Sequence, residues 1–580
     1  MTHIYKEPAT FMEDMMVGFA AAYPAYVELV PGGCIRAEEP RHGKVAIIPG
    51  GGSGHYPGFA GVVGPGMADA AVIGNIFTSP SAQDVYTVAK AAEVGGGVIL
   101  CPGNYAGDVM NFTAAKDRLQ AEGIPTRTVW VTDDIASAPP SEIQKRRGIA
   151  GDFVVYKVAG AAAEEGLDLD AVEAVTHRIN ANTRTLGVAF AGCTMPGATS
   201  PLFSVSGGQM GVGLGIHGEP GIAERPTLPA DELAAMLVDA LLTDMPLERG
   251  QRITTLINGL GATKYEELFV LWKYVRELLE SVHGLVLVEP EIGEMVTSLD
   301  MAGCSLTLVK LEDDLERYWR APCDTPAYRK GAPPQQRESA GHHRVPTATA
   351  SSVENTPADA SGSPAGIRAA RAARRAMTAM RDALVAAEAD LGNLDAIAGD
   401  GDHGRGMVRG VTAACDEIAN KADANSSVQS VLVAAGDAWA SRAGGTSGVL
   451  WGAMLSAIGR TLGNNPENVS EVDVARAVRA GLETMQRLGN ANAGDKTILD
   501  AFIPFADTLD AQAHVGANLG EAWAKAAQAA QTAAQATAEL RPRVGRARPL
   551  ADRSVGTPDP GAISFALCMQ AIAPCVADCS

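Results

Sequence analysis

A histidine set among glycines is the first residue whose surroundings indicate chemistry. His217 lies in the run MGVGLGIHGEPG, between Gly215 and Gly218, where the lack of neighbouring side chains lets a ligand approach closely. The same run satisfies the dinucleotide pattern G-x-G-x-x-G, but the Glu-Pro-Gly that follows leaves no place for the helix which that pattern requires. We therefore predict that His217 contacts a ligand other than a dinucleotide, in preference to a packing role.

Two further motifs place polar side chains at the ends of apolar, strand-like runs. PGGGSGHYPG (Pro49–Gly58) follows KVAII, so backbone N–H groups can approach a small polar ligand while His55 forms a hydrogen bond to it; a purely structural tight turn is the alternative. GNYAGDVMNF (Gly103–Phe112) follows VILC and puts Asp108 at the start of an expected helix. Asp108 is therefore either a helix N-cap or, paired with His55, a general base for a hydroxyl group.

A third motif, NLDAIAGDGDHGRGM (Asn393–Met407), contains carboxylates that alternate with glycine. Asp395, Asp400 and Asp402 are close enough in sequence for their oxygens to converge on a hard cation. An EF-hand loop that began at Asp400 would need a bidentate glutamate at its last position, where this chain has Val411, and this excludes that calcium site. Because magnesium keeps several waters and shares phosphate oxygens, the pattern favours Mg²⁺ beside a nucleotide.

A phosphate-binding segment is expected near these aspartates. SRAGGTSGVLWG (Ser441–Gly452) offers two glycines followed by Thr446 and Ser447 at the expected start of a helix, where N–H groups, hydroxyls and the helix dipole attract an anion. A second run, GNANAGDKT, has the glycine spacing of a P-loop, but Asp495 stands where a P-loop has lysine. We reject a Walker A loop there and keep the run as a candidate nucleotide contact.

The elements that position these motifs form two parts. Over residues 1–330, short β-rich runs that end in Gly, Pro or Asp alternate with helix-compatible stretches, which predicts an α/β domain with ligand loops at the carboxyl ends of its strands. Over residues 367–580, apolar residues recur at helical spacing, which predicts an all-α domain. The segment between them, 331–366, is rich in Pro, Ser, Thr and Ala and is predicted to be a flexible linker.

The composition fits packed domains and excludes several other classes of protein. A chain of 580 residues is too long to fold around one hydrophobic core, so we expect two or three domains. The 46% hydrophobic and 20% charged fractions are typical of globular domains. A formal net charge of -20 opposes binding to nucleic acid or anionic lipid. We expect no secretory signal and no membrane-spanning helix, which would need roughly 18 apolar residues. Nine cysteines without a Cys-x-x-Cys pair predict reduced thiols and a cytoplasmic location.

Taken together, the motifs resemble those of the dihydroxyacetone kinase family over nearly the whole chain. GGGSGH, NYAGD, GIHGEPGI, LDAIAGDGDHG, GGTSG, GDKT and DPGA occur in the family's order. The resemblance is to the single-chain form, whose continuous linker distinguishes it from systems in which the two domains are separate proteins. It implies a ketose-binding domain of two α/β subdomains, then a helical-barrel nucleotide-binding domain. The implied reaction is ATP-dependent phosphorylation of a terminal hydroxyl of a short ketose.

The resemblance also implies roles for individual residues. His217 is expected to attack the ketose carbonyl carbon as a neutral imidazole and to hold the sugar as a hemiaminal, which glycerol cannot form, while Asp108 takes the proton of the attacking hydroxyl. The residues expected to position the sugar are Gly52, Ser53, Gly54 and His55. The expected ligands of two Mg²⁺ ions that bridge the ATP phosphates are Asp395, Asp400 and Asp402. Nucleotide contacts are expected at Gly401, Asp402, His403, Gly404, Gly445, Thr446, Ser447, Gly494, Arg546, Asp559, Pro560 and Gly561.

Two departures from the dihydroxyacetone-specific members bear on the substrate. Tyr56 replaces the glutamate of GSGHEP, and Gly103 replaces the lysine of K-N-Y-T-G-D, whose side chain normally reaches the sugar. Loss of that side chain leaves room for an extra hydroxymethyl group on the substrate. The motifs GHYPGF and GNIFTSPS also resemble those of the erythrulose kinases of the family. We therefore expect erythrulose ahead of dihydroxyacetone, and a homodimer, which is usual for similar proteins.

Two other functions are compatible with the same motifs. A phosphocarrier or regulatory protein would hold its nucleotide without exchanging it, as the helical protein of the phosphotransferase-linked systems retains ADP. An FAD-AMP lyase side activity that forms cyclic FMN would use the helical domain alone. The sequence does not fix the enantiomer of the ketose or the carbon that is phosphorylated.

Overall fold

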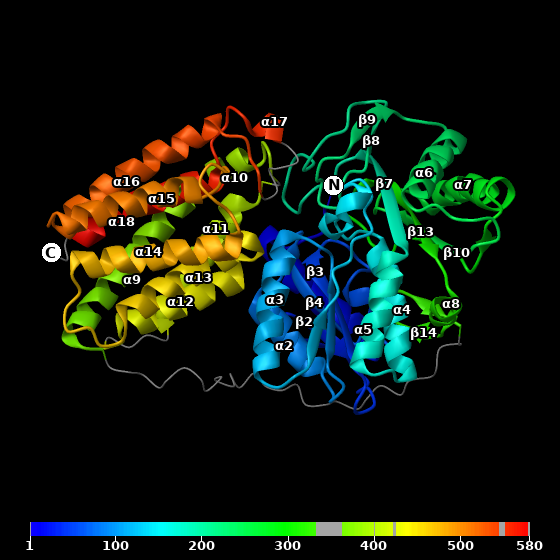
Figure 1. Ribbon diagram of the computed structural model, residues 1–580, viewed down its shortest axis with the longest axis horizontal. Coiled ribbons are helices and arrows are strands. Elements are labelled where there is room, and N and C mark those ends of the chain that lie inside the picture. The colour runs from blue at the N-terminus through cyan, green and yellow to red at the C-terminus, as the bar shows by residue number, and fades with distance from the viewer. Residues whose placement is uncertain (1, 332–361, 400, 421–424, 545–550, 578–580) are drawn as a thin grey trace. The chain divides into compact units, whose positions relative to one another are not determined.

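The computed structural model describes residues 2–331, 362–399, 401–420, 425–544 and 551–577 (Figure 1). The chain divides into two compact units, Met1–His343 and Arg344–Ser580. Most of the predicted linker lies outside the described residues, so the predicted domain boundaries stay predictions; helix α9 already begins at Pro364. None of the described helices is long and apolar enough to cross a membrane.

The first sheet of the N-terminal unit has six strands in the order β1-β2-β4-β3-β5-β6. The strands β4, β3, β5 and β6 run parallel, and β1 and β2 form an antiparallel pair at one edge. The apolar runs KVAII and VILC form the buried β3 and β5, as expected for strands covered on both faces. The strands are β1 (Val27–Val30), β2 (Gly33–Arg36), β3 (Ala46–Ser53), β4 (Ala70–Ile76), β5 (Val98–Pro102) and β6 (Thr126–Thr128).

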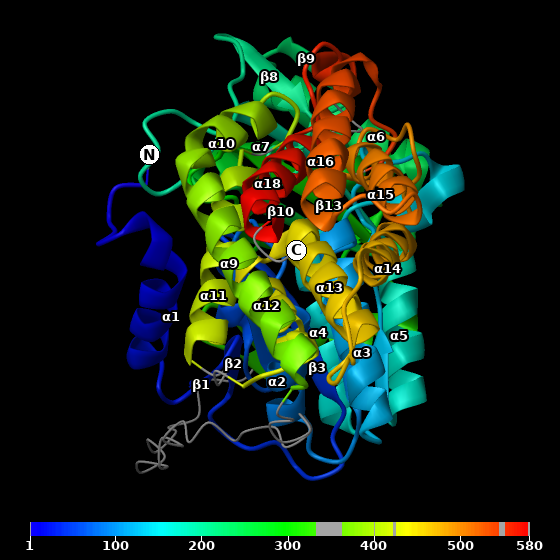
Figure 2. The same cartoon turned by 90° about the vertical axis from the view of Figure 1, so that its left-hand side faces the viewer.

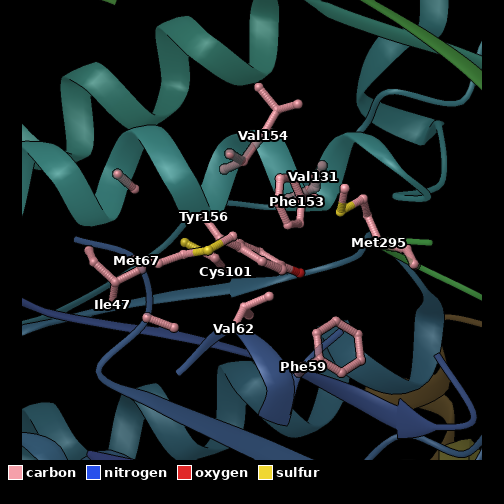
Figure 3. Close-up of a cluster of buried hydrophobic side chains, with 14 of the residues drawn as sticks. Ile47, Phe59, Val62, Met67, Cys101, Val131, Phe153, Val154, Tyr156 and Met295 are labelled. Carbon is pink, nitrogen blue, oxygen red and sulfur yellow. The ribbon is translucent and has the colours of Figure 1, made fainter. Parts of the chain in front are cut away.

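Helices cover both faces of this sheet. Apolar side chains of α2 and α3 pack on one face, and those of α4 and α5 pack on the other. Figure 3 shows the second of these cores, where Phe153 and Tyr156 of α4 lie over Ile47 of β3 and Cys101 of β5. The helices are α1 (Phe11–Ala22), α2 (Ala82–Ala92), α3 (Ala106–Ala121), α4 (Gly151–Glu165) and α5 (Leu169–Ala181).

The second sheet of this unit is mainly antiparallel and runs in the order β11-β10-β13-β7-β8-β9, with β12 also paired to β10. Helices α6 (Ala230–Asp244) and α7 (Tyr265–Glu277) cover one face, and α8 (Asp313–Arg320) contributes to the core around α4. The strand-like run GLVLVEPE forms only the short β11 and the start of β12. The strands are β7 (Thr183–Ala191), β8 (Gln209–Val212), β9 (Ala223–Pro226), β10 (Arg252–Gly259), β11 (Val286–Leu287), β12 (Glu291–Gly293), β13 (Ala302–Lys310), and the separate pair β14 (Cys323–Asp324) and β15 (Arg329–Lys330).

The C-terminal unit is all-helical, and eight of its described helices form a closed ring (Figure 2). Each packs against the next, and the last closes against the first. The ring is α9 (Pro364–Ala386), α11 (His403–Asn420), α12 (Val428–Ala443), α13 (Gly445–Leu462), α14 (Glu471–Gly489), α15 (Leu499–His514), α16 (Leu519–Ala536) and α18 (Pro560–Ala577), with the short α10 (Glu388–Asp395) and α17 (Ala551–Ser554) beside it. The predicted fold class, an α/β domain followed by a helical barrel, is confirmed.

Candidate active site

The predicted sugar contacts lie at the carboxyl end of β3. This strand runs to Ser53, so Gly50–Gly52 lie inside it, and the predicted turn begins later, at Gly54 with a φ of 101°. Gly52 has no room for a side chain, because a Cβ there would lie 2.5 Å from the backbone nitrogen of Thr78. The buried Ser53 Oγ has no hydrogen-bond partner among the described residues, which leaves it available to a ligand.

His55 and His217 face each other through their Nε2 atoms, which lie 3.0 Å apart. His55 Nδ1 lies 2.7 Å from the carbonyl oxygen of Thr297, and His217 Nδ1 lies 2.8 Å from a carboxylate oxygen of Glu219. Because both of these acceptors lack a proton, both Nδ1 atoms must donate. An Nε2–Nε2 contact this short then needs one proton between the rings, so the histidine pair carries one positive charge beside the carboxylate.

Aromatic side chains enclose the histidine pair. Phe77 stacks on His55 with ring centroids 5.1 Å apart, and both Phe77 and Tyr105 present an edge-on contact to His217, at 5.2 and 4.8 Å. Burial, and then the charge of His217, lower the pKa of His55 from its usual value to about 3. His55 is therefore neutral at physiological pH.

A loop between β12 and β13 joins the two histidine segments. The backbone N–H of Leu299 donates to the carbonyl oxygen of Gly54 at 2.8 Å, and Ser298 Oγ donates to the carbonyl oxygen of Ile216 at 2.5 Å. Together with the Thr297 carbonyl, these bonds fix the distance between the two imidazoles. The second sheet therefore contributes to the site through backbone positions that carry no recognisable motif.

Asp108 lies in the first turn of α3, whose N-cap residue is Tyr105, so the N-cap interpretation of Asp108 is wrong. Its buried carboxylate accepts a hydrogen bond of 2.8 Å from Ser79 Oγ. Because β5, which precedes α3, lies beside β3, Asp108 and His55 follow neighbouring parallel strands. Its role as general base stays a prediction.

The two departures that bear on the substrate lie in different surroundings. The Tyr56 ring packs against Phe19 of α1 with centroids 6.0 Å apart and is 41% exposed. Gly103 lies beside Tyr105, where a Cβ would be 3.0 Å from the edge of the ring, and the Tyr105 hydroxyl donates to the carbonyl oxygen of Gly148 at 2.9 Å. Position 103 thus adjoins an aromatic ring that borders His217, whereas the Tyr56 side chain contacts α1.

In the C-terminal unit, several predicted nucleotide contacts line one cavity of about 200 Å³. Its walls include Asp395, His403, Ser447 and the segment Asp559–Gly561. Ser447 lies in the first turn of α13, the expected helix start, and Asp559 lies at the start of α18. Two helix N-termini, which attract anions, therefore contribute to this cavity.

Negative charge in this cavity exceeds the positive charge near it. Burial first, and then the neighbouring carboxylates of Asp500 and Asp395, together raise the pKa of Asp559 to about 7, while Lys496 opposes them. Lys496 lines the cavity, and its ammonium group donates to the carbonyl oxygen of Ser554 at 2.6 Å. Three carboxylates against one ammonium group fit a site that takes a divalent cation.

Other predicted contacts lie away from the cavity or outside the described residues. Gly404 packs against α10, where a Cβ would lie 2.1 Å from the carbonyl oxygen of Glu388. Within the described part of the chain, no three His, Cys, Asp or Glu side chains are arranged to hold a metal ion. The magnesium set stays a prediction, since one of its members is not described. Predicted residues outside the described ranges are Asp400 and Arg546; those described but not on the cavity wall are Gly401, Asp402, Gly404, Gly445, Thr446 and Gly494.

Sequence reasoning missed several side chains that shape the two sites. Glu219 had a signal, because it is a carboxylate two residues from His217 in the same glycine-rich run. Lys496 also had one, since it follows Asp495 in GDKT. Phe77 and Thr297 had no signal, because only the fold brings their segments to the histidine pair.

Comparison with known proteins identifies a domain family in each of the two units. Residues 17–327 match the Dak1 domain and residues 397–574 match the DAK2 domain. The chain is 56% identical to a D-erythrulose kinase of Mycolicibacterium smegmatis over 99% of both chains, and 51% identical to an L-erythrulose kinase of Pectobacterium atrosepticum over 99% of this chain and 96% of that one. The dihydroxyacetone kinase from C. freundii, solved in complex with AMP-PNP and Mg²⁺, superposes with a TM-score of 0.51 at 29% identity over 99% of both chains.

The chain therefore belongs to the dihydroxyacetone kinase family, in its single-chain form. The predicted enzyme class, an ATP-dependent kinase, is confirmed by these relatives.

Proposed function

We propose that this kinase transfers the γ-phosphoryl group of ATP to a terminal hydroxyl of erythrulose, which His217 holds as a hemiaminal. Dihydroxyacetone is the second expected substrate. The observation that carries the proposal is the contact between His55 Nε2 and His217 Nε2 at 3.0 Å, with both Nδ1 atoms already engaged. This arrangement supplies a nucleophile and a proton at one place, which the capture of a ketone requires and the binding of a polyol does not.

Capture of the ketose follows from the proton count of the histidine pair. The proton between the rings moves to His55 Nε2, which frees the Nε2 lone pair of His217 to attack the carbonyl carbon. Because its pKa is lowered to about 3, His55 gives this proton readily to the carbonyl oxygen as the C=O π bond breaks. His55 ends neutral, the sugar gains a hydroxyl group, and the positive charge stays on the His217 ring.

Phosphoryl transfer requires a terminal hydroxyl of the captured sugar to lose its proton. Asp108 is the proposed base, since its buried carboxylate lies in the first turn of α3, after a strand that neighbours β3, and accepts a hydrogen bond from Ser79 Oγ. Ser53 Oγ, which is buried without a partner among the described residues, is proposed to donate to a sugar oxygen. Both residues come from the strand ends next to the histidine pair.

We infer that the cavity in the C-terminal unit holds ATP with magnesium, through Asp395, Asp400 and Asp402. Magnesium held by these carboxylates would supply positive charge that offsets the charge on the transferred phosphoryl group. The excess of carboxylates around Asp559 supports a cation at this place, and the α13 N-terminus with Ser447 is suited to phosphate oxygens. The other predicted nucleotide contacts keep the same proposed role.

We also propose a homodimer and a cytoplasmic location. The described cysteines are all free thiols, and all but Cys575 are buried, which supports a reducing compartment. Sedimentation analysis of the full chain would test the dimer. We prefer the kinase to a nucleotide-retaining carrier or a cyclic-FMN-forming lyase, because the relatives above 50% identity are named as kinases.

A coupled assay of ADP release tests the proposed function. The substrates are dihydroxyacetone, both erythrulose enantiomers, glyceraldehyde and glycerol, and NMR of the product identifies the phosphorylated carbon. We expect turnover of the ketoses, with an erythrulose preferred, and no turnover of glycerol. Equal turnover of glycerol and the ketoses would exclude capture through a carbonyl group.

A further inference from the structure

We infer that Glu219 is the positioning residue that decides which of the two facing histidines becomes the nucleophile. It holds the Nδ1 proton of His217 and stabilises the positive charge of its ketose adduct. This inference rests on the proposed function and deepens it. Nothing in the motif GIHGEPGI itself assigns this role to Glu219.

Glu219 binds His217 with both carboxylate oxygens. Oε1 lies 2.8 Å from Nδ1 of the ring, and Oε2 accepts a hydrogen bond of 3.0 Å from the backbone N–H of the same residue. A two-point contact of this kind fixes the ring relative to its own backbone. Because the carboxylate accepts at Nδ1, the lone pair available for bond formation is at Nε2, the atom that faces His55.

The surroundings keep Glu219 ionised and in place. Burial alone would raise the pKa of Glu219, but the contacts with His217 and Arg147 outweigh burial and lower it. A guanidinium nitrogen of Arg147 lies 3.8 Å from Oε2, and a second is held by Asp134 at 2.8 Å. Gly215 leaves the space for the carboxylate, because a Cβ there would lie 2.0 Å from Oε2.

The two histidines differ in the partner of Nδ1, and this difference assigns their roles. His55 donates to the neutral carbonyl of Thr297, whereas His217 donates to an anion. An anionic partner raises the basicity of the ring and stabilises its cation, so the positive charge is favoured on His217 both before and after capture. Without Glu219 the two rings would compete more evenly for the proton, and Nε2 of His217 would be a weaker nucleophile.

The charge balance of capture shows where Glu219 acts. A bond forms between His217 Nε2 and the carbonyl carbon, the C=O π bond breaks, and the proton of the pair goes to the carbonyl oxygen through His55. The product ring carries hydrogen on Nδ1 and carbon on Nε2, so it is a cation that cannot lose its charge while Nδ1–H is held. Its counter-ion is the carboxylate 2.8 Å away.

The test compares Glu219→Gln with the wild type in the full chain. The amide keeps the size of the side chain and one acceptor oxygen but removes the charge. Glu224→Gln is the matched control, since Glu224 lies on the exposed β9 and accepts from the backbone N–H of Ser206 rather than from His217. The readouts are ¹⁵N NMR of labelled histidine without ketose, with the His217 signals assigned by their loss in His217→Asn, and KM and kcat for the ketose.

In the wild type we expect a protonated Nδ1 on His217 in the free enzyme. Glu219→Gln should shift the His217 ¹⁵N signals towards those of a ring that shares its Nε2 proton more evenly with His55, and raise KM for the ketose by roughly 10- to 100-fold with a smaller change in kcat, the range found for residues that orient a metal-bound histidine. Glu224→Gln should change neither.

Three results would overturn the inference. First, an unprotonated Nδ1 of His217 in the wild type would refute the inference. This result needs no variant, so the inference stays testable even if Glu219→Gln folds poorly. Unchanged His217 ¹⁵N signals in a folded Glu219→Gln, or an unchanged KM, also refute it. If instead His217→Asn turned over ketose normally, the proposed function would fail while the ¹⁵N result for Glu219 still stood.

Discussion

The two candidate sites differ in how far their charges are balanced. In the N-terminal unit, His217 is paired with Glu219, Glu219 is near Arg147, and Arg147 is paired with Asp134. In the C-terminal unit, by contrast, the carboxylates of Asp395, Asp500 and Asp559 lie near the ammonium group of Lys496 and outnumber it. Burial raises the pKa of Asp559 to about 7. The first site is complete in itself, and the second has a charge that a ligand must neutralise.

This difference matches what each site binds in our proposal. A neutral ketose brings no charge, so a site that captures it must already hold its nucleophile, proton and counter-ion. A nucleotide with its metal brings charges of both signs, and a site with excess carboxylate is poised to take the cation. Variants that separate the two sites can therefore test the comparison.

The largest expected effect is that of His217→Ala. It removes the proposed nucleophile, so ketose-dependent ADP release should fall on the order of 10⁴-fold or more. Binding of ATP, measured by calorimetry, should be unchanged, because His217 belongs to the other unit. Normal turnover by this variant would rule out covalent capture.

The next effect concerns Asp559→Asn in the nucleotide cavity. Loss of a carboxylate should weaken binding of Mg²⁺·ATP by roughly 10- to 100-fold. It should not lower the melting temperature of the ligand-free protein, because it relieves repulsion with Asp395 and Asp500. Asp382→Asn on α9, an exposed carboxylate paired with Arg381, is the control and should change neither property. A destabilised variant that binds nucleotide normally would contradict the unbalanced-charge description.

Substrate choice should respond to position 103 and not to position 56. Gly103→Lys fills space beside Tyr105, so we expect the preference for erythrulose over dihydroxyacetone in kcat/KM to fall by roughly 10-fold, the effect of about one carbon in a pocket. Tyr56→Glu is the matched variant, because its side chain contacts α1, and its preference should be that of the wild type. If Tyr56→Glu changed the preference and Gly103→Lys did not, the extra hydroxymethyl group of erythrulose would not bind beside position 103.

The smallest effect is on the pH dependence of stability. The pKa of His55 is about 3 in the folded protein and near 6.5 when unfolded, so between these values the unfolded state binds a proton that folded His55 does not. The free energy of unfolding should therefore fall as pH falls from 6.5 towards 3, by at most about 1.4 kcal/mol per pH unit from this group. His55→Asn should show a shallower fall in urea titrations between pH 7 and 4.5; an identical slope would contradict a neutral His55.

The fold class and the candidate site residues could be read from the sequence because both depend on local patterns. Buried strands such as KVAII, and helices such as the one that starts at Gly445, are visible as apolar runs and glycine signals. His217, His55 and Asp108 stand out because polar residues follow such elements. The turn after β3 begins later than the glycines indicate, because Gly50, Gly51 and Gly52 lie inside the strand, where close neighbours such as Thr78 leave no room for side chains.

The contacts that position these residues could not be predicted in the same way. Thr297 reaches His55 from 242 positions away and acts through its backbone oxygen, which leaves no trace in residue type. Phenylalanine is common in hydrophobic cores, so its residue type does not reveal that Phe77 stacks on His55 in the folded chain. Glu219 is the exception, since its nearness to His217 in sequence could have suggested the pairing.

The most direct measurement of the central claim is ¹³C NMR of dihydroxyacetone labelled at its carbonyl carbon, mixed with the full chain in the absence of ATP. Covalent capture predicts a bound signal in the range of a tetrahedral carbon, and its loss in His217→Ala. A bound ketose whose carbon keeps its carbonyl shift in the wild type would contradict the account.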